Sequence, residues 1–325
     1  MVSIIIPVYQ VSDYIERCLY SVMGQTYNDI ECIIVDDATK DDSIEKCERL
    51  INANHNPNPN NGGGIRFKIL HHEVNRGLSA ARNTGTKAAT GDWVFYLDSD
   101  DEISLDCIEQ LMHIAQEHPD AEMVVGNTEM HHQDGHVTQI INQEIPNDYT
   151  TNQEIFTLYY QRKLHVYAWN ILIRHSFLAQ HGLFFKEGII YEDHLWLFYV
   201  MKVLSKLHIC KDVTYHYYLR PGSIVTSAEG YTVGTSYSII YNEILHNLTP
   251  KGENAELGLF VERFCKHYLE HKTSIPAYKS LMKEYRRYAR KYDNRGVSVK
   301  LALTCVMGLV PGGLKVLHSL RKLKS

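Results

Sequence analysis

One pattern recurs from Ser3 to Met130: a short run rich in β-branched residues, a polar turn, and a stretch with the apolar spacing of a helix. Such alternation indicates a parallel sheet covered by helices. The predicted strands are Ser3–Val8, Ile30–Val35, Arg66–Leu70, Trp93–Leu97 and Glu122–Val125. The predicted helices are Ser12–Gly24, Asp41–Ile51, Ser79–Ala89 and Leu105–Glu117. The expected fold class is therefore α/β, with a Rossmann-like, mostly parallel sheet.

Size, charge and cysteine content limit the compartment and the partners. A chain of 325 residues suits one large core with an appended helical region. The net charge of −5 gives no reason to expect nucleic acid, because binders of the phosphate backbone carry a basic domain or stripe. Seven scattered cysteines without a C-x-x-C pair favour a reducing compartment over a disulfide framework or zinc cage. The N-terminus lacks a signal peptide pattern, so we predict a cytoplasmic location.

Polar residues follow each predicted strand at its carboxyl end. Ligands of open α/β sheets bind beyond these ends. The clusters are Tyr9-Gln10, Asp36-Asp37, Asn75-Arg76-Gly77 and Asp98 to Asp101. We therefore expect one binding site along this edge of the sheet.

The sharpest cluster is Asp98-Ser99-Asp100-Asp101, directly after an apolar strand. Two carboxylates ~5 Å apart repel by about 3 kcal/mol at an effective dielectric constant of ~20, so a cation is expected between them. Oxygen ligands favour Mg²⁺ or Mn²⁺ over zinc. For Asp101, and for Ser104 nearby, an N-cap of the following helix is an equal alternative.

Two neighbouring strand ends add weaker signals. Asp37 could accept hydrogen bonds from a ribose or a base, although turns recruit aspartate in any case. After the third strand, Gly77 permits a tight turn, Ser79 can begin a helix, and Arg82 lies one turn further along. Arg82 is either a ligand-binding residue or an ordinary solvated helix arginine.

Four segments together resemble family 2 glycosyltransferases of the bacterial surface-polysaccharide type. In chain order they are Pro7-Val8-Tyr9, Val35-Asp36-Asp37, Asn75 to Asn83 and Leu97 to Asp101. The resemblance covers about Val2 to Ser227 and implies the GT-A fold. It departs from the family at Gln10, where asparagine is usual, and at Ala38, where glycine is usual.

The resemblance also implies roles for individual residues. Nucleotide binding falls to Pro7, Tyr9, Asp37, Asn75, Arg82, Asp98 and Arg220, and metal binding to Asp98 and Asp100. Arg220 would lie in a loop that closes over the diphosphate.

A later acidic pair, Glu192 and Asp193, matches the family's catalytic motif at the start of a helix predicted over Asp193–Val203. Asp193 would act as the base that takes the acceptor hydroxyl proton. The alternative is that both residues only stabilise the helix by interacting with its dipole. Trp169 and Asn170 resemble the acceptor-binding segment, although a buried structural tryptophan is equally plausible.

We expect a catalytic domain over residues 1–230, with a nucleotide-binding half (1–126) and an acceptor-binding half (127–230). Residues 231–325 should form a helical C-terminal region. Within it, residues 297–325 combine a short apolar run with a leucine stripe and basic residues, as in helices that lie on anionic membrane surfaces. Docking on the protein or on a dimer partner is the alternative. Location on the cytoplasmic face of the inner membrane follows from the first reading.

Eighteen histidines raise the question of further metal sites. The pair His267 and His271 has no third ligand or H-E-x-x-H motif and reads as a solvated helix face. The doublets His71-His72 and His131-His132 are interpreted as surface residues near strand ends.

Other nucleotide-binding classes find less support. A sugar nucleotidyltransferase should carry a glycine-rich phosphate loop after the first strand, where this chain has Pro7 to Asp13, and a dehydrogenase should carry G-x-G-x-x-G. The remaining alternative is a non-catalytic scaffold subunit that binds sugar nucleotides. We predict an inverting enzyme that moves a sugar from a nucleotide-diphosphate donor, UDP by resemblance, to a hydroxyl of a sugar or lipid-linked sugar.

Overall fold

The computed structural model describes residues 1–54, 64–142, 145–160, 163–220, 223 and 230–247. The chain divides into two compact units. The first comprises Met1–Gly188 and Glu192–Thr226, and the second contains Ile189–Tyr191 and the chain from Ser227 onward. In the second unit the structure describes one long helix, α9 (Gly230–Asn247).

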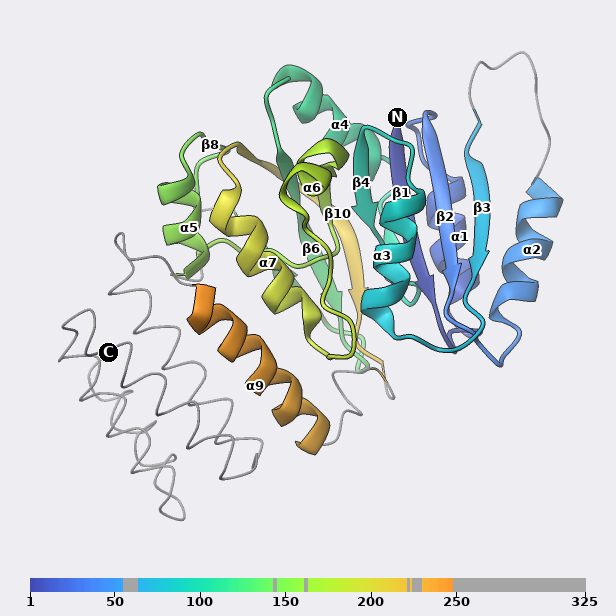
Figure 1. The fold of residues 1–325 in the computed structure, drawn as a ribbon. Helices are drawn as coiled ribbons and strands as arrows, with labels where there is room; N and C mark the ends of the chain where they lie inside the picture. Colours follow the sequence, from blue (N-terminus) through green and yellow to red (C-terminus); the bar gives the residue numbers. More distant parts are fainter. Residues whose placement is uncertain (55–63, 143–144, 161–162, 221–222, 224–229, 248–325) are drawn as a thin grey trace. The chain divides into compact units, whose positions relative to one another are not determined.

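The first half of the first unit is the predicted parallel sheet (Figure 1). Its strands are β1 (Val2–Val8), β2 (Ile30–Asp36), β3 (Arg66–His71) and β4 (Trp93–Tyr96), in the order β3-β2-β1-β4. Its helices are α1 (Ile15–Met23), α2 (Ser43–Asn54), α3 (Leu78–Ala88) and α4 (Cys107–Glu117). Each element overlaps its predicted range, which confirms the α/β fold class.

The sheet continues beyond β4 with mixed strand directions. β9 (Ile171–Arg174) lies antiparallel between β4 and β6 (Met123–His131), and β10 (Leu207–Tyr218) runs parallel to β6. Shorter strands extend these: β7 (Val137–Ile140) pairs with β6, while β5 (Glu102–Ile103) and β8 (Asp148–Tyr149) pair with β10. The helices here are α5 (Asn152–Tyr160), α6 (His175–His181) and α7 (Glu192–Val203). The antiparallel insertion of β9 was not predicted.

β10 differs from its prediction in one respect. The sequence pattern of this segment predicts two separate strands, at Lys206–Ile209 and Val213–Leu219, but the structure has one continuous strand. Its pairing with β6 shifts register between Ile209 and Tyr215. Such an irregularity bends a strand and breaks the residue pattern by which strands are recognised.

The core lies around β1, whose seven residues are all buried. Both faces of a central parallel strand are covered, so its sequence is almost continuously apolar. One face packs against α1, α2 and α4, and α3 covers the other (Figure 1). Pro7 is tolerated in this central strand because the pairing of β1 with β4 has already ended at Ile5.

Some predictions fall on other parts of the chain. The segment 297–325 and the pair His267 and His271 lie outside the described residues. Within the described residues, no helix is both long and apolar enough to span a bilayer.

Candidate functional site

Arg82 is the centre of a buried ion-pair network at the carboxyl edge of the sheet. Its side chain is only 2% exposed. The guanidinium donates to Asp98 Oδ1 at 2.7 Å and to Glu192 Oε1 at 2.5 Å. The helix that carries it lies close to β1 because Gly85 has no Cβ, and one added there would stand 2.3 Å from Ile5 Cγ2. The interpretation of Arg82 as a solvated arginine is therefore wrong.

This network perturbs the ionisation of its members. Burial raises the pKa of Glu192 to about 7, although Arg82 acts against the shift. Burial also raises the pKa of Asp98, again against Arg82, and the nearby Asp100 adds to the rise. Perturbed carboxyl groups of this kind gather where a protein performs chemistry or binds a cation.

Asp100 faces a second arginine. Its Oδ2 accepts from Arg220 Nε at 2.6 Å, and its side chain is 21% exposed. Arg17 donates to the backbone carbonyl of Asp100 at 2.6 Å and lies 3.5 Å above the ring of Tyr218. The two metal-binding candidates Asp98 and Asp100 are thus each held by a different arginine.

Asp101 is an internal anchor. Its side chain is fully buried and accepts from the Tyr215 hydroxyl and from the backbone N–H of Tyr218, both at 2.8 Å. Burial, followed by the charge of Asp100, raises its pKa well above the usual value. The alternative role as a helix cap is wrong, because α4 begins after Asp106 and has no side-chain cap. The hydroxyl of Ser104, the other proposed cap, has no partner among the described residues.

Asp37 organises the loop after β3. It is 3% exposed, and its two oxygens accept from the backbone N–H groups of Arg76 and Gly77 at 2.8 and 2.7 Å. His72 Nδ1 lies 2.7 Å from the same carboxylate. Gly77 has a φ of 87°, which confirms the tight turn that its sequence position predicted.

Both departures from the family pattern fall at strained backbone positions. Gln10 has a φ of 52° and Ala38 a φ of 56°. A left-handed conformation costs an alanine about 1 kcal/mol or more relative to glycine, which suffers no Cβ clash there. The Gln10 N–H donates to Thr39 Oγ1 at 2.8 Å, which helps to hold this turn.

Asp193 lies in the first turn of α7, beside Glu192. Its charge acts on Arg82 and Asp98, so it shares their electrostatic environment. Among the described residues its carboxylate has no hydrogen bond or ion pair, and it is partly exposed. Tyr191, two residues earlier, has a φ of 60°, an unusual conformation that turns the chain into the helix.

The remaining candidates differ in accessibility. Tyr9 is 41% exposed and Asn75 is exposed, whereas Pro7 is buried inside β1. Trp169 is half-buried in a stack with three tyrosines, and its ring lies 4.4 Å from that of Tyr167.

Asn170, with a φ of 58°, is buried. Its side chain bonds to Asn127, Thr128 and Thr214. These bonds support a packing role for Asn170.

Several residues of this edge were not predicted from the sequence. Arg17, Tyr215 and Tyr218 each contact the Asp100-Asp101 turn. Tyr215 and Tyr218 are more than 110 residues away from that turn in sequence. Arg17, the third residue of α1, and the tyrosines of β10 are visible in the sequence, but nothing in the sequence pairs them with the turn.

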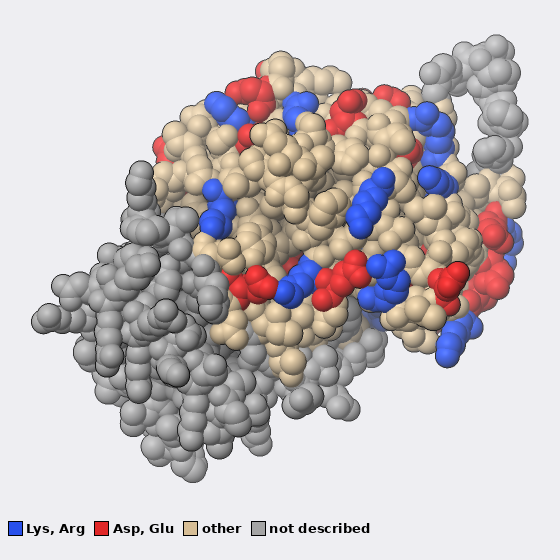
Figure 2. All heavy atoms as spheres, viewed as in Figure 1, with Lys and Arg blue, Asp and Glu red and all other residues tan. Residues whose placement is uncertain are grey.

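The surface near this edge carries charges of both signs. Figure 2 shows acidic and basic side chains alternating in a row across the viewed face, toward the carboxyl ends of β1 and β2. A groove of about 670 Å³ runs along α1, β5 and β10, lined among others by Glu16, Arg17 and His216.

Comparison with known proteins identifies the class. The family model described as glycosyl transferase family 2 matches residues 3–181. The protein EpsH of Bacillus subtilis is 31% identical over 229 residues, which cover 69% of this chain and 62% of EpsH. This chain therefore spans less than two thirds of that relative.

Two solved structures share the fold. One is S. aureus TarS 1-349 in complex with UDP-GlcNAc, at a TM-score of 0.62 and 22% identity, covering 82% of this chain and 72% of that one. The other is the mannosyltransferase PcManGT from Pyrobaculum calidifontis with GDP-Man and Mn²⁺, at a TM-score of 0.53 and 14% identity, covering 94% and 86%. At these identities the likeness concerns the fold alone, and it confirms the predicted GT-A architecture.

The chain belongs to glycosyltransferase family 2. The family that the four sequence motifs indicated is thereby confirmed.

Proposed function

We propose that the protein is an inverting, metal-dependent glycosyltransferase that uses a nucleotide-diphosphate sugar. The observation that carries this proposal is the placement of Arg82, which binds Asp98 and Glu192 at once. Arg82 links the Asp98-Ser99-Asp100 turn to the start of α7, although Asp98 and Glu192 lie 94 positions apart in the chain. Asp100 and Asp193 then come to the same edge of the sheet, one for the donor and one for the acceptor.

Asp98 and Asp100 are the residues that would hold a divalent cation. Arg82 engages one oxygen of Asp98 and Arg220 engages one oxygen of Asp100, so each carboxylate keeps a second oxygen. Carboxylate oxygens together with donor phosphates are the ligand set that Mg²⁺ and Mn²⁺ prefer. When bound, the cation would neutralise the charge that develops on the departing diphosphate.

Asp193 would serve as the catalytic base. The acceptor hydroxyl attacks the anomeric carbon, its proton passes to a carboxylate oxygen of Asp193, and the bond to the nucleoside diphosphate breaks on the opposite side. A base needs a carboxylate that is accessible and not already engaged by the protein, and Asp193 meets both conditions among the described residues. Glu192, bound to Arg82, would position it.

Arg220 would bind the diphosphate. Arginine forms bidentate bonds with phosphate, and this side chain already lies at Asp100, next to the proposed donor site. Tyr9, Asn75 and the Asp37-anchored loop would border the nucleotide on the same edge. Arg82 would act here through Asp98, as a positioning residue.

The donor is proposed to be a UDP-sugar, as the family resemblance implies; of the two structures that share the fold, TarS is solved with UDP-GlcNAc and PcManGT with GDP-Man. The acceptor is proposed to be the hydroxyl of a sugar or lipid-linked sugar during assembly of a surface polysaccharide. Trp169 would form part of its binding surface. Residues 297–325 would bring the enzyme to the cytoplasmic face of the membrane.

The test is release of nucleoside diphosphate from UDP-, GDP- and dTDP-sugars, with Mn²⁺ or with EDTA. We expect one donor to turn over only with metal. Asp193→Asn should lower the rate by about 10²–10⁴-fold, the usual contribution of a general base. Asp100→Asn should lower it by about 10²-fold or more, as loss of an electrostatic group does.

Asp120→Asn is the matched control, since this carboxylate pairs with Lys206 on the surface before β6, away from the site. Its rate should equal that of the wild type. Donor binding without turnover, with lipid-linked acceptors included, would instead favour the scaffold subunit. Pyrophosphate release from a nucleoside triphosphate and a sugar phosphate would favour the nucleotidyltransferase.

A further inference from the structure

Two histidines and a glutamate, none of them part of the carboxylate site described above, meet on the neighbouring strands β6 and β10. Glu129 and His131 are two residues apart on β6, and such residues share one face of a strand. In the parallel register of β10, His216 pairs with Glu129. His216 alternates with Tyr215, whose hydroxyl binds Asp101, so it points to the opposite face of the strand.

The three potential ligand atoms form a nearly regular triangle. His131 Nε2 lies 3.4 Å from His216 Nδ1, and Glu129 Oε2 lies 3.5 Å from His216 Nδ1 and 4.0 Å from His131 Nε2. Ligands about 2.0–2.2 Å from a tetrahedral ion stand roughly 3.3 Å apart. The two imidazole rings are tilted by 56°, so their in-plane lone pairs are able to converge on one point.

Surrounding residues hold this triangle in place. Gln139 on β7 donates to Oε1 of Glu129 at 3.2 Å, which leaves Oε2 for the two histidines. The ring of His131 stacks on Tyr218 at 4.5 Å. Outer contacts of this kind orient the ligands of protein metal sites.

There is also space for an exchangeable ligand. His216 lines the groove of about 670 Å³ along α1 and β5, so one side of the triangle opens to solvent. Glu129, His131 and His216 are each about one quarter exposed. Three protein ligands with an open fourth position are a recurrent arrangement for tetrahedral zinc.

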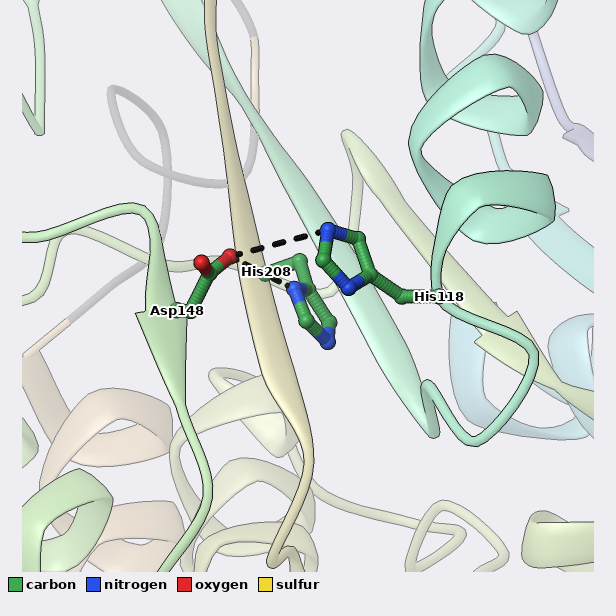
Figure 3. Close-up of side chains that lie close together, drawn as sticks. All are labelled: His118, Asp148 and His208. Carbon is green, nitrogen blue, oxygen red and sulfur yellow. Dashed lines mark hydrogen bonds and ion pairs between the residues drawn. The ribbon is translucent and has the colours of Figure 1, made fainter.

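A second histidine cluster offers a comparison. His118, Asp148 and His208 also lie close together, with the carboxylate of Asp148 facing a nitrogen of each ring (Figure 3). However, the two rings are stacked 3.9 Å apart and only 22° from parallel. Lone pairs of parallel rings run side by side and do not converge on one ion. His208 Nδ1 lies 2.8 Å from Asp148 Oδ1, as in an ordinary hydrogen bond from an imidazole N–H to a carboxylate.

We propose that Glu129, His131 and His216 form a binding site for a divalent transition-metal ion of the zinc type. The site joins β6 to β10 and takes nitrogen ligands, whereas the proposed donor site takes only oxygen ligands. Imidazole suits Zn²⁺ and Co²⁺ better than Mg²⁺ or Mn²⁺, so the two sites select different ions.

Co²⁺ is the probe, because four-coordinate Co²⁺ absorbs visible light far more strongly than six-coordinate Co²⁺. We expect the full chain, freed of metal with EDTA, to develop this absorption with one equivalent of Co²⁺ and to lose it when Zn²⁺ is added. His131→Gln and His216→Gln should abolish the absorption and weaken Co²⁺ binding at least tenfold. Gln139→Ala, which removes only an outer contact, should weaken binding about 10-fold.

His118→Gln is the matched control and should titrate like the wild type. Asp98→Asn and Asp100→Asn should also keep the absorption, which separates this proposal from that of the donor site. Far-ultraviolet circular dichroism verifies that each variant is folded. If a histidine variant does not fold, Gln139→Ala is used in its place. Absence of the absorption in the wild type, or its persistence in folded His131→Gln and His216→Gln, would overturn the proposal.

Discussion

The acidic groups at the carboxyl edge of the sheet form two layers that differ in their hydrogen-bond and ion-pair partners and in their exposure to solvent. In the inner layer, Glu192 is bound to Arg82 and Asp101 to Tyr215, and all four side chains are nearly inaccessible to solvent. In the outer layer, Asp100 is partly exposed beside Arg220, and Asp193 is partly exposed without a partner among the described residues. Asp98 links the layers, with one oxygen on Arg82 and 22% of its side chain exposed.

This difference predicts which substitutions change the stability of the fold and which change catalysis. A buried charge is tolerated only with a partner, so removing one member of the inner layer leaves a buried charged or polar group without its partner. A partly exposed carboxylate keeps contact with solvent, so it remains available to a cation or a proton. We therefore expect inner-layer changes to alter stability first, and outer-layer changes to alter turnover alone.

Arg82→Leu should give the largest effect on stability. It leaves Asp98 and Glu192 without their cation, and breaking a buried pair costs about 3–5 kcal/mol. Arg82→Lys should recover only part of the loss, because a single ammonium group cannot reach both carboxylates as the planar guanidinium group does. Urea unfolding measures both values.

Arg76→Leu provides the matched control for this change. Arg76 lies six residues earlier and pairs with Glu187, but both side chains are more than 40% exposed. An exposed pair contributes about 0–1 kcal/mol. If Arg82→Leu were no more destabilising than Arg76→Leu, the inner layer would not be a structural unit.

Glu192 should make stability depend on pH. Its pKa is raised from 4.5 to about 7 in the folded protein, so the folded state holds the proton more tightly. This contribution is fully present below pH 4.5 and is lost as the pH rises through 7. At 1.36 kcal/mol per pKa unit, a rise of 2.5 units corresponds to about 3 kcal/mol at most.

Glu192→Gln should remove this pH dependence. Urea unfolding of both proteins at pH 5, 6, 7 and 8 should show wild-type stability falling more steeply than that of the variant. The opposite trend, with the wild type gaining stability relative to Glu192→Gln as the pH rises, would mean that Arg82 dominates and keeps Glu192 ionised.

The elements around the nucleotide half were predictable because each has a local signal. β1 and β2 are buried runs of isoleucine and valine, and their predicted ends differ from the observed ends by one residue. The glycine at position 77 predicted a tight turn, and the acidic residues after the strands predicted a binding site at this edge of the sheet. Topology then placed these ends together, since parallel strands share one carboxyl edge.

The partners across the site could not be read from the sequence. Arg82 and Glu192 are 110 residues apart, and a helix arginine gives no sign of whether it faces water or a carboxylate. β9 has only four residues and follows the left-handed Asn170, so neither strand length nor periodicity revealed it. Asp101 resembled a helix cap in the sequence because its partner, Tyr215, lies more than 110 residues away.

Asp100→Asn should give the smallest change in stability, and it tests the outer layer most directly. The substitution removes the pair with Arg220, which favours the wild type, but it also removes a negative charge that raises the pKa values of Asp98 and Asp101. These contributions oppose each other and largely cancel. The free energy of unfolding should therefore change by less than about 1 kcal/mol in either direction, while metal-dependent turnover is lost. A loss of stability as large as that of Arg82→Leu would place Asp100 in the inner layer and leave the edge without the division between support and chemistry.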